Sequence, residues 1–185
     1  RLGHVNPTAM KETLGIQMPE NFNCYICEEM NQKSHSPKRT QNTETTLENL
    51  TQFQHVQMDI MYHKEARNDV NYTLVVIDVY SRLLLVRPLT DLSAKEVLTA
   101  FVKMIVNLQK KPKLITTDRG SCFTAESFRE YVFNQAVKLQ YCSPNKHEGN
   151  AYAERVVGTL RRKSLAMLNH ARLSIHFLYD AIRYA

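Results

Sequence analysis

The sequence has no long apolar run, and none of its 185 residues belongs to a stretch of the roughly 18 apolar residues that a membrane span requires. The start of the chain lacks the charged region, apolar stretch and small-residue cleavage site of a secretory signal. Cysteines are few: a close pair at Cys24 and Cys27 and two distant singles, Cys122 and Cys142. This is not the pattern of a disulfide-rich secreted scaffold. These absences disfavour a membrane or secreted protein and favour an intracellular, reducing setting.

Acidic residues are outnumbered by basic ones, and the difference is concentrated in one part of the chain. The sequence has 24 Lys and Arg against 18 Asp and Glu, a formal net charge of +6. From residue 155 onward a single acid, Asp180, is accompanied by six bases: Arg155, Arg161, Arg162, Lys163, Arg172 and Arg183. A local basic excess favours a polyanionic partner such as nucleic acid.

The chain divides into a short first region, a linker and a larger domain. Residues 1–36 have little apolar periodicity, so this region needs help, such as a metal, to become stable. Residues 37–52 are polar and rich in Thr, Asn and Gln, which is typical of a linker or extended arm. Residues 53–185 can form one globular domain. Because the chain starts with Arg1 and stops at Ala185 inside a predicted helix, we expect it to be a piece of a longer protein.

The larger domain is predicted to be a mixed α/β layer fold. In residues 53–62, Val56, Met58 and Ile60 alternate with His55, Gln57 and Asp59, which predicts a strand with one polar face. Ser93 and Glu96 form a capping box at the start of a predicted helix. The predicted order is three antiparallel strands (53–62, 72–78 and 83–88, the last ended by Pro88), helix 93–109, strand 114–118, a helix from about 124, strand 138–142 and a helix over about 150–170.

Three carboxylates from separate segments are the candidate metal ligands. Asp59 lies on the polar face of a strand, where an ionised carboxylate is costly unless a cation or a hydrogen-bond donor meets it. Asp118 ends a short apolar strand, at the edge of a sheet where ligands commonly bind. Glu154 lies on the last long helix. Three such carboxylates suit Mg²⁺ or Mn²⁺ and phosphoryl transfer. The alternative is that the aspartates are ordinary turn or cap residues.

Glu154 shares one side of its helix with basic residues and a glycine. At about 100° per residue, this side comprises Glu154, Arg155, Gly158, Arg161 and Arg162. The arginines could bind a phosphodiester backbone, and the glycine would let DNA approach closely. A merely solvated basic face is the alternative.

Four runs around these residues, HVQMD, VVIDVYSR, TTDRGSCF and GNAYAER, resemble the integrase core of retroviruses and long-terminal-repeat retrotransposons, most closely the copia-like class. The resemblance implies an RNase H-like fold in which Asp59, Asp118 and Glu154 are catalytic and hold Mg²⁺ or Mn²⁺. Asp78 matches a position that is not a ligand.

The implied activity is trimming of 3′ ends and strand transfer into target DNA, by a homo-oligomer acting in the nucleus. An RNase H-like nuclease and a decayed fragment that only binds DNA are the alternatives.

The first region is similar to the zinc-binding region of the same class. Cys24 and Cys27 have the C-x₂-C spacing that lets two thiolates reach one zinc ion. The resemblance makes His4 the second of two histidine ligands and places the first before Arg1. His35 or water could complete the site, and a metal-free thiol pair is the alternative.

Two positions near the carboxylates depart from the family pattern. Asn150 is followed by Ala151 where relatives usually have glycine. Cys122 comes directly after the Gly-Ser pair that follows Asp118, at a position where relatives often have an acidic or aromatic residue. We expect these departures to affect loop geometry and rate and to leave the reaction type unchanged. His63, His147 and His170 are expected to be exposed or partner-facing and without a catalytic role.

Overall fold

The computed structural model describes residues 11–12, 15–17, 19, 51–63, 67–142 and 150–185. The chain forms two compact units. One comprises Asn42–Gly158, and the other comprises Arg1–Gln41 together with Thr159–Ala185. His4, Cys24 and Cys27 lie outside the described residues, so the zinc site stays a prediction.

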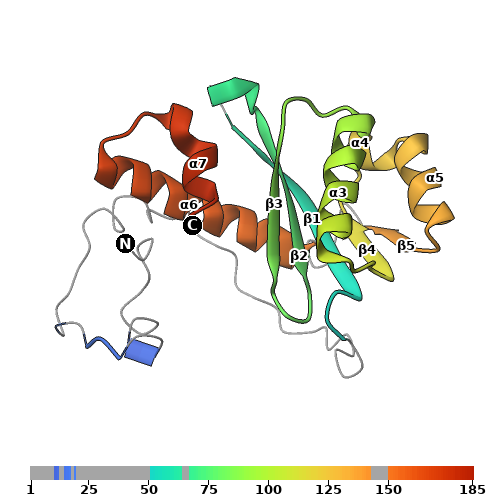
Figure 1. Cartoon of the computed structure of the whole chain (residues 1–185), viewed down its shortest axis with the longest axis horizontal. Helices are drawn as coiled ribbons and strands as arrows, with labels where there is room; N and C mark the ends of the chain where they lie inside the picture. Colours follow the sequence, from blue (N-terminus) through green and yellow to red (C-terminus); the bar gives the residue numbers. More distant parts are fainter. Residues whose placement is uncertain (1–10, 13–14, 18, 20–50, 64–66, 143–149) are drawn as a thin grey trace. The chain divides into compact units, whose positions relative to one another are not determined.

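A five-stranded mixed sheet forms the centre of the Asn42–Gly158 unit (Figure 1). Its order is β3-β2-β1-β4-β5. The first three strands pair antiparallel, and β4 and β5 add in parallel on the other side of β1. The antiparallel meander and the mixed α/β class are therefore confirmed. The strands are β1 (His55–Tyr62), β2 (Tyr72–Asp78), β3 (Leu84–Leu89), β4 (Leu114–Thr117) and β5 (Lys138–Tyr141).

One face of the sheet packs against helices α3 (Ala94–Leu108), α4 (Ser121–Thr124) and α5 (Glu126–Asn134), and this face carries the hydrophobic core. α3 begins where the capping box predicts, because the Ser93 hydroxyl accepts a hydrogen bond from the Glu96 backbone N–H at 3.2 Å. Three phenylalanines stack at the centre of the core, with ring centroids 6.2 Å apart for Phe101 and Phe128 and 5.6 Å apart for Phe123 and Phe128. Val56 and Met58 of β1 belong to the same cluster.

The other face of the sheet carries the polar side of β1 and receives the start of helix α6 (Ala151–Ala171). Gln57 pairs with Thr116 of β4 in parallel register, and both side chains are buried on this face. Strand alternation places Asp59 on the same face as Gln57. The predicted polar face of β1 is confirmed, and it is covered by protein at Gln57.

The segment Thr159–Ala185 contains the rest of α6, the 3₁₀ turn η3 (Ile175–Phe177) and helix α7 (Leu178–Ile182). The Lys163 ammonium group donates a hydrogen bond to the backbone carbonyl of Ala185 at 3.1 Å, which ties α6 to the C-terminal residue. Within the part of the chain that the structure describes, no helix combines the length and the apolar character needed to cross a membrane.

Three local predictions are corrected by the structure. Pro88 lies inside β3, opposite Thr73, because β3 is an edge strand that can lack one N–H donor. The helix predicted from about Thr124 is present as α5, but the segment before it, predicted as a loop, forms the short helix α4. His63 is 1% exposed, and its Nε2 lies 2.6 Å from the Thr73 hydroxyl, so it is a buried structural histidine. The exposure of His170 is confirmed, and His147 lies outside the described residues.

Candidate active site

Asp59 lies in the middle of β1, half-buried on the polar face of the sheet. Burial raises the pKa of its carboxyl group to about 6, and the nearby carboxylates of Asp118 and Glu154 add to the rise. A hydrogen bond from the Ile60 backbone N–H at 2.8 Å lowers the pKa of Asp59, but it offsets only part of the rise. The three predicted carboxylates are therefore close enough to repel one another.

Asp118 directly follows β4 and is exposed. In the parallel register, Gln57 is opposite Thr116, so Asp59 and Asp118, each two residues farther along, continue on the same side of neighbouring strands. The Asp118 carboxylate accepts a hydrogen bond from the Gly120 backbone N–H at 3.0 Å. A Cβ atom at Gly120 would lie 3.1 Å from the same carboxylate oxygen. A side chain at position 120 would therefore crowd the Asp118 carboxylate, and glycine avoids this contact.

Glu154 is carried by the first turn of α6, and two buried side chains fix that turn to β1. The Gln57 side-chain oxygen accepts hydrogen bonds from the backbone N–H groups of Tyr152 at 3.0 Å and Ala153 at 3.3 Å. The Asn150 amide donates to the Met58 carbonyl at 2.9 Å. Gln57 thus caps the helix from another element, satisfying N–H groups that a helix cannot satisfy itself. These contacts bring Glu154 to the same edge of β1 as Asp59.

Two thiols lie beside the carboxylates. Burial raises the pKa of Cys142, and the carboxylates of Glu154, Asp118 and Asp59 raise it further, so this thiol lies near all three acids. The pKa of Cys122 is also raised, mainly by burial and to a smaller extent by the charge of Asp118. Both cysteines are free, and burial together with the nearby negative charge favours the neutral thiol.

The residues at this edge fit a divalent cation of the Mg²⁺ class. All three acids carry carboxylate oxygens, which such ions prefer, and the charges of Asp118 and Glu154 both act on Asp59, so negative charge is concentrated there. The Asn150 side-chain oxygen is buried beside this cluster and has no hydrogen-bond partner among the described residues. Among the described residues, no group of three or more His, Cys, Asp or Glu side chains lies close enough together to hold a metal ion. Mg²⁺ commonly takes only one or two carboxylate ligands and completes its shell with water and substrate phosphate.

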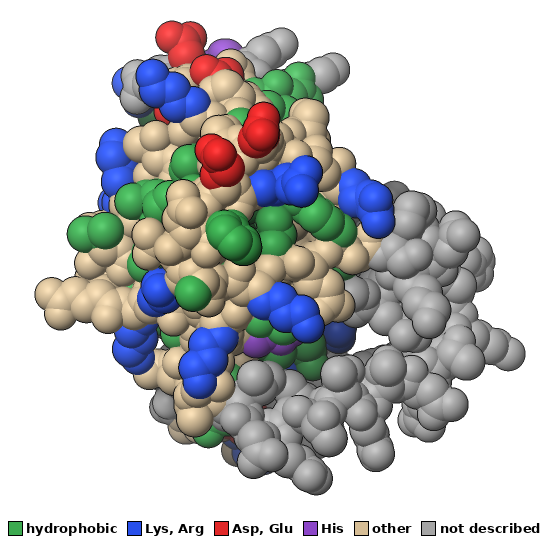
Figure 2. Space-filling view, turned by 90° about the vertical axis from the view of Figure 1, so that its right-hand side faces the viewer, with side chains coloured by type: hydrophobic (Ala, Val, Ile, Leu, Met, Phe, Trp, Pro, Cys, Tyr) green, Lys and Arg blue, Asp and Glu red, His purple; other side chains and the backbone are tan. Residues whose placement is uncertain are grey.

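The predicted DNA-contacting residues all lie on α6. Arg155, Arg161 and Arg162 are exposed and Gly158 is half-exposed. The guanidinium of Arg155 donates to the Ala151 carbonyl at 2.9 Å and lies 5.1 Å from the centre of the Tyr152 ring. In Figure 2, which shows another face of the molecule, the acidic side chains lie in the upper half and the Lys and Arg side chains are spread over both halves.

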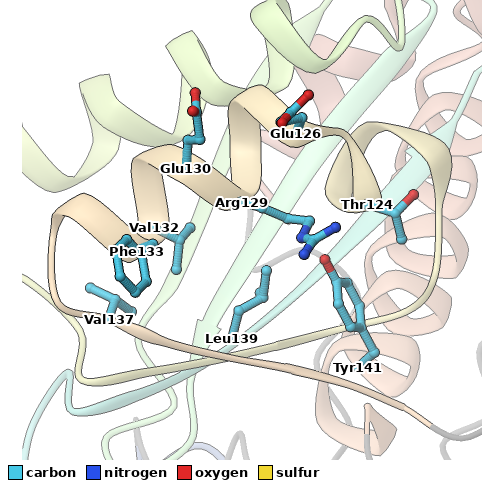
Figure 3. Close-up of a pocket in the computed structure, with 9 residues that line it drawn as sticks. All are labelled: Thr124, Glu126, Arg129, Glu130, Val132, Phe133, Val137, Leu139 and Tyr141. Atoms are coloured by element: carbon cyan, nitrogen blue, oxygen red, sulfur yellow. The ribbon is translucent and has the colours of Figure 1, made fainter.

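A groove of about 760 Å³ lies elsewhere on the same unit, between α5 and the edge strand β5. In Figure 3 the Arg129 side chain points into it, and Glu126 and Glu130 point away. None of the three carboxylates lines this groove. Two of the acids, Asp118 and Glu154, are instead exposed on the surface, where a long polymer can reach them. The groove is lined by Thr124, Glu126, Arg129, Glu130, Val132, Phe133, Val137, Leu139 and Tyr141.

The sequence and the fold of this chain are similar to those of known proteins. The family profile described as integrase core domain matches residues 50–147, more than half of the chain. The chain therefore belongs to the integrase core domain family, within the retroviral integrase superfamily. The Gag-Pol polyprotein of walleye dermal sarcoma virus is 28% identical over 122 residues. That match covers 66% of this chain, and the chain spans only 7% of the length of the polyprotein.

Solved structures support the RNase H-like fold of integrase catalytic cores. The HTLV-2 integrase catalytic core domain in complex with magnesium, in its trimeric form, has a TM-score of 0.55 and 22% identity and covers 71% of this chain and 80% of its own. One chain of a simian T-cell lymphotropic virus intasome in complex with PP2A regulatory subunit B56 gamma has a TM-score of 0.62 and 19% identity. That match covers 86% of this chain and 55% of the other. These relatives are retroviral, so the copia-like assignment stays a prediction.

Sequence reasoning missed the residues that hold the site together. Gln57 was assigned only to the polar face of a strand, and Asn150 was noted only for the alanine that follows it. Their contacts join positions 95 and 92 residues apart in the chain. The available signal was a buried polar side chain next to Asp59, because buried amides need hydrogen-bond partners.

Proposed function

We propose that this chain is the catalytic core of a polynucleotidyl transferase that trims the 3′ ends of retroelement DNA and joins them to target DNA. The observation that carries the proposal is that Asp118 and Glu154 lie near enough to Asp59 to add to the pKa rise that burial causes, in a chain of the integrase core family. Asp59, Asp118 and Glu154 would hold Mg²⁺ or Mn²⁺. The bound ions would polarise the scissile phosphate and lower the pKa of the attacking water or 3′-hydroxyl.

The residues of this chain position the DNA and the attacking group for two successive steps. In the trimming step, a water oxygen bonds to phosphorus as the bond to the departing 3′ oxygen breaks, and that oxygen takes a proton. In strand transfer, the new 3′-hydroxyl oxygen replaces the 3′ oxygen of the target strand at phosphorus, so one phosphodiester is exchanged for another and no external energy source is needed. Arg155, Arg161 and Arg162 would donate hydrogen bonds to neighbouring phosphates, and Gly158 would admit the backbone.

Three further parts of the proposal concern the whole protein. His4, Cys24 and Cys27 would bind Zn²⁺ with a fourth ligand. The protein would act as a homo-oligomer, in line with the dimeric and trimeric forms of the HTLV-2 core. Its place of action would be the nucleus, reached from a cytoplasmic particle.

The decisive experiment is strand transfer by the full chain with a labelled terminal duplex and Mg²⁺, comparing Asp118→Asn with Asp91→Asn. Asp91 is an exposed aspartate before α3, outside the carboxylate cluster, so it is a matched control. We expect Asp118→Asn to lower the rate at least about 100-fold with little change in DNA affinity, because the loss falls on the chemical step. Wild-type rate in Asp118→Asn would contradict the proposal. Cleavage of RNA/DNA hybrids without joining would favour a nuclease, and DNA binding without either reaction would favour a fragment that only binds.

A further inference from the structure

A buried aspartate that takes no part in the carboxylate cluster organises the turn between β2 and β3. Asp78 is fully buried, and its carboxylate accepts hydrogen bonds from the Ser81 backbone N–H at 3.0 Å, the Ser81 hydroxyl and the Tyr80 backbone N–H at 3.4 Å. Burial alone would raise the pKa of Asp78, but these hydrogen bonds, with one from the Phe53 backbone, outweigh it and lower the pKa. The turn is therefore held by an ionised carboxylate.

This turn presents Arg82 in a fixed conformation. The Arg82 backbone N–H donates to the Asp78 carbonyl at 2.9 Å, and Arg82 has a φ of +62°, a left-handed conformation that is unfavourable for a residue with a side chain. Backbone strain of this kind persists only where surrounding contacts impose it, and it is frequent at binding sites.

The Arg82 guanidinium lies over the ring of Tyr152 in the first turn of α6, 3.7 Å from the ring centre. Arg155 approaches the same ring at 5.1 Å. Two positive groups thus share one aromatic ring, and this ring belongs to the residue two positions before Glu154. No acidic partner is recorded for Arg82 among the residues that the structure describes. A guanidinium that stacks on a ring keeps its in-plane N–H groups available for an oxyanion.

We propose that Arg82, Tyr152 and Arg155 form a phosphate-binding subsite for a nucleic-acid strand beside the carboxylates. The ring orients the Arg82 fork, and the second guanidinium supplies the charge that makes a phosphodiester the fitting ligand. The subsite rests on the proposed function, since it would bind the backbone of the DNA strand on which the carboxylates act.

The test is equilibrium binding of a labelled DNA duplex to the full chain over a series of NaCl concentrations. Arg82→Gln should weaken binding about three- to tenfold at low salt and reduce the slope of log affinity against log salt by about one, because one phosphate contact is lost. Arg82→Lys keeps the charge but not the planar fork, so we expect an intermediate loss. Tyr152→Leu should resemble Arg82→Gln, and Tyr152→Phe should bind like the wild type.

Arg87→Gln is the matched control. Arg87 lies on β3 opposite Leu74, a core residue, and so belongs to the sheet face away from Asp59. Equal binding by Arg82→Gln and Arg87→Gln, with both variants folded by circular dichroism, would overturn the subsite. Wild-type protein that binds no DNA would contradict the proposed function itself. Inorganic phosphate is the competing probe: displacement of the duplex by low millimolar phosphate, lost in Arg82→Gln, would show a site for an isolated phosphate and also overturn a strand-binding role.

Discussion

The two faces of the sheet differ in what holds them in place, although β1 contributes to both. On one face Val56 and Met58 are fully buried in a cluster of aliphatic and aromatic side chains. On the other face Gln57 and Asp59 meet α6 and β4 through a few directed hydrogen bonds and through charge. Burial tolerates any apolar side chain of suitable size, whereas a hydrogen bond requires a particular atom at a particular place.

The two faces should therefore differ in what a substitution changes: the stability of the fold on one face and the arrangement of the acids on the other. Substitutions on the core face should change the free energy of unfolding and leave the acids of the folded molecules in place. Substitutions on the carboxylate face should change the site with a smaller effect on stability, or even with a gain. Four measurements can break or sharpen this division.

The largest expected effect on stability is at Phe128. Its side chain is fully buried between Phe101 and Phe123, so Phe128→Ala should lower the free energy of unfolding by about 3–5 kcal/mol through lost burial and a cavity. Urea denaturation measures this loss. Phe133→Ala is the control, because Phe133 is 82% exposed on the same helix and should change stability little. Similar losses at the two positions would show that the core does not lie where the sheet and α5 place it.

Local periodicity was sufficient to predict the core face. The alternation in β1, the Ser93–Glu96 capping box and the apolar spacing of α3 each act over a few residues, so the sequence displays them directly. The three acids were predicted from strand-face placement, basic neighbours on the helix and motifs that resemble a family, and not from their spacing.

The contacts on the other face could not be predicted in this way. Gln57 and Asn150 meet their partners across more than 90 residues, and nothing in the local pattern distinguishes them from exposed amides. The cation–π contact between Arg82 and Tyr152 is also long-range, and it depends on a turn set by Asp78. These roles depend on which residues meet in the folded protein, and the order of residues along the chain does not show this.

The second prediction concerns the capping of α6 by Gln57. Gln57→Leu keeps the volume but leaves the N–H groups of Tyr152 and Ala153 without an acceptor, which should cost about 2 kcal/mol of stability. Because the start of α6 sets the position of Glu154, we also expect a higher Mg²⁺ concentration for half-maximal activity. Urea denaturation and a Mg²⁺ titration of strand transfer measure the two effects.

Gln140→Leu is the matched control for this change, because Gln140 is an exposed strand residue on β5. If Gln57→Leu were as stable and as responsive to Mg²⁺ as Gln140→Leu, the cap would not position the helix. Faster hydrogen exchange of the Tyr152 and Ala153 amides in Gln57→Leu would identify the lost contacts independently of activity.

The third prediction is a gain of stability on removing charge from the site. The pKa of Asp59 rises from 3.8 to about 6 on folding, so the metal-free fold favours the protonated acid. Its contribution to stability is fully present below pH 4 and is lost as the pH rises through about 6. The change in pKa corresponds to about 3 kcal/mol, which partial exposure reduces to about 1–2 kcal/mol. Asp59→Asn should therefore stabilise the metal-free protein by this amount at pH 7 and have little effect at pH 4.

Thermal unfolding at pH 4 and pH 7, with and without Mg²⁺, checks this sign. In the wild type, Mg²⁺ should raise the melting temperature at pH 7, because ligand that binds only the folded state stabilises it. Asp59→Asn should lose most of that response. A melting temperature of Asp59→Asn below that of the wild type at pH 7 in EDTA would show that the acids do not repel one another in the folded protein.

The smallest expected effect concerns the exposed basic side of α6, where neither core burial nor a directed contact across the sheet is involved. Arg161→Gln removes one solvated charge, so it should leave unfolding unchanged and weaken DNA binding only about three- to fivefold at low salt, with a salt slope reduced by about one. Arg183→Gln, an exposed arginine at the end of α7, is the control for net charge. Because both variants lose the same charge, only a phosphate contact at Arg161 can make their slopes differ. Equal slopes would mean that this side of α6 attracts DNA through net charge alone, and the arginine contacts would then be limited to the residues nearest the carboxylates.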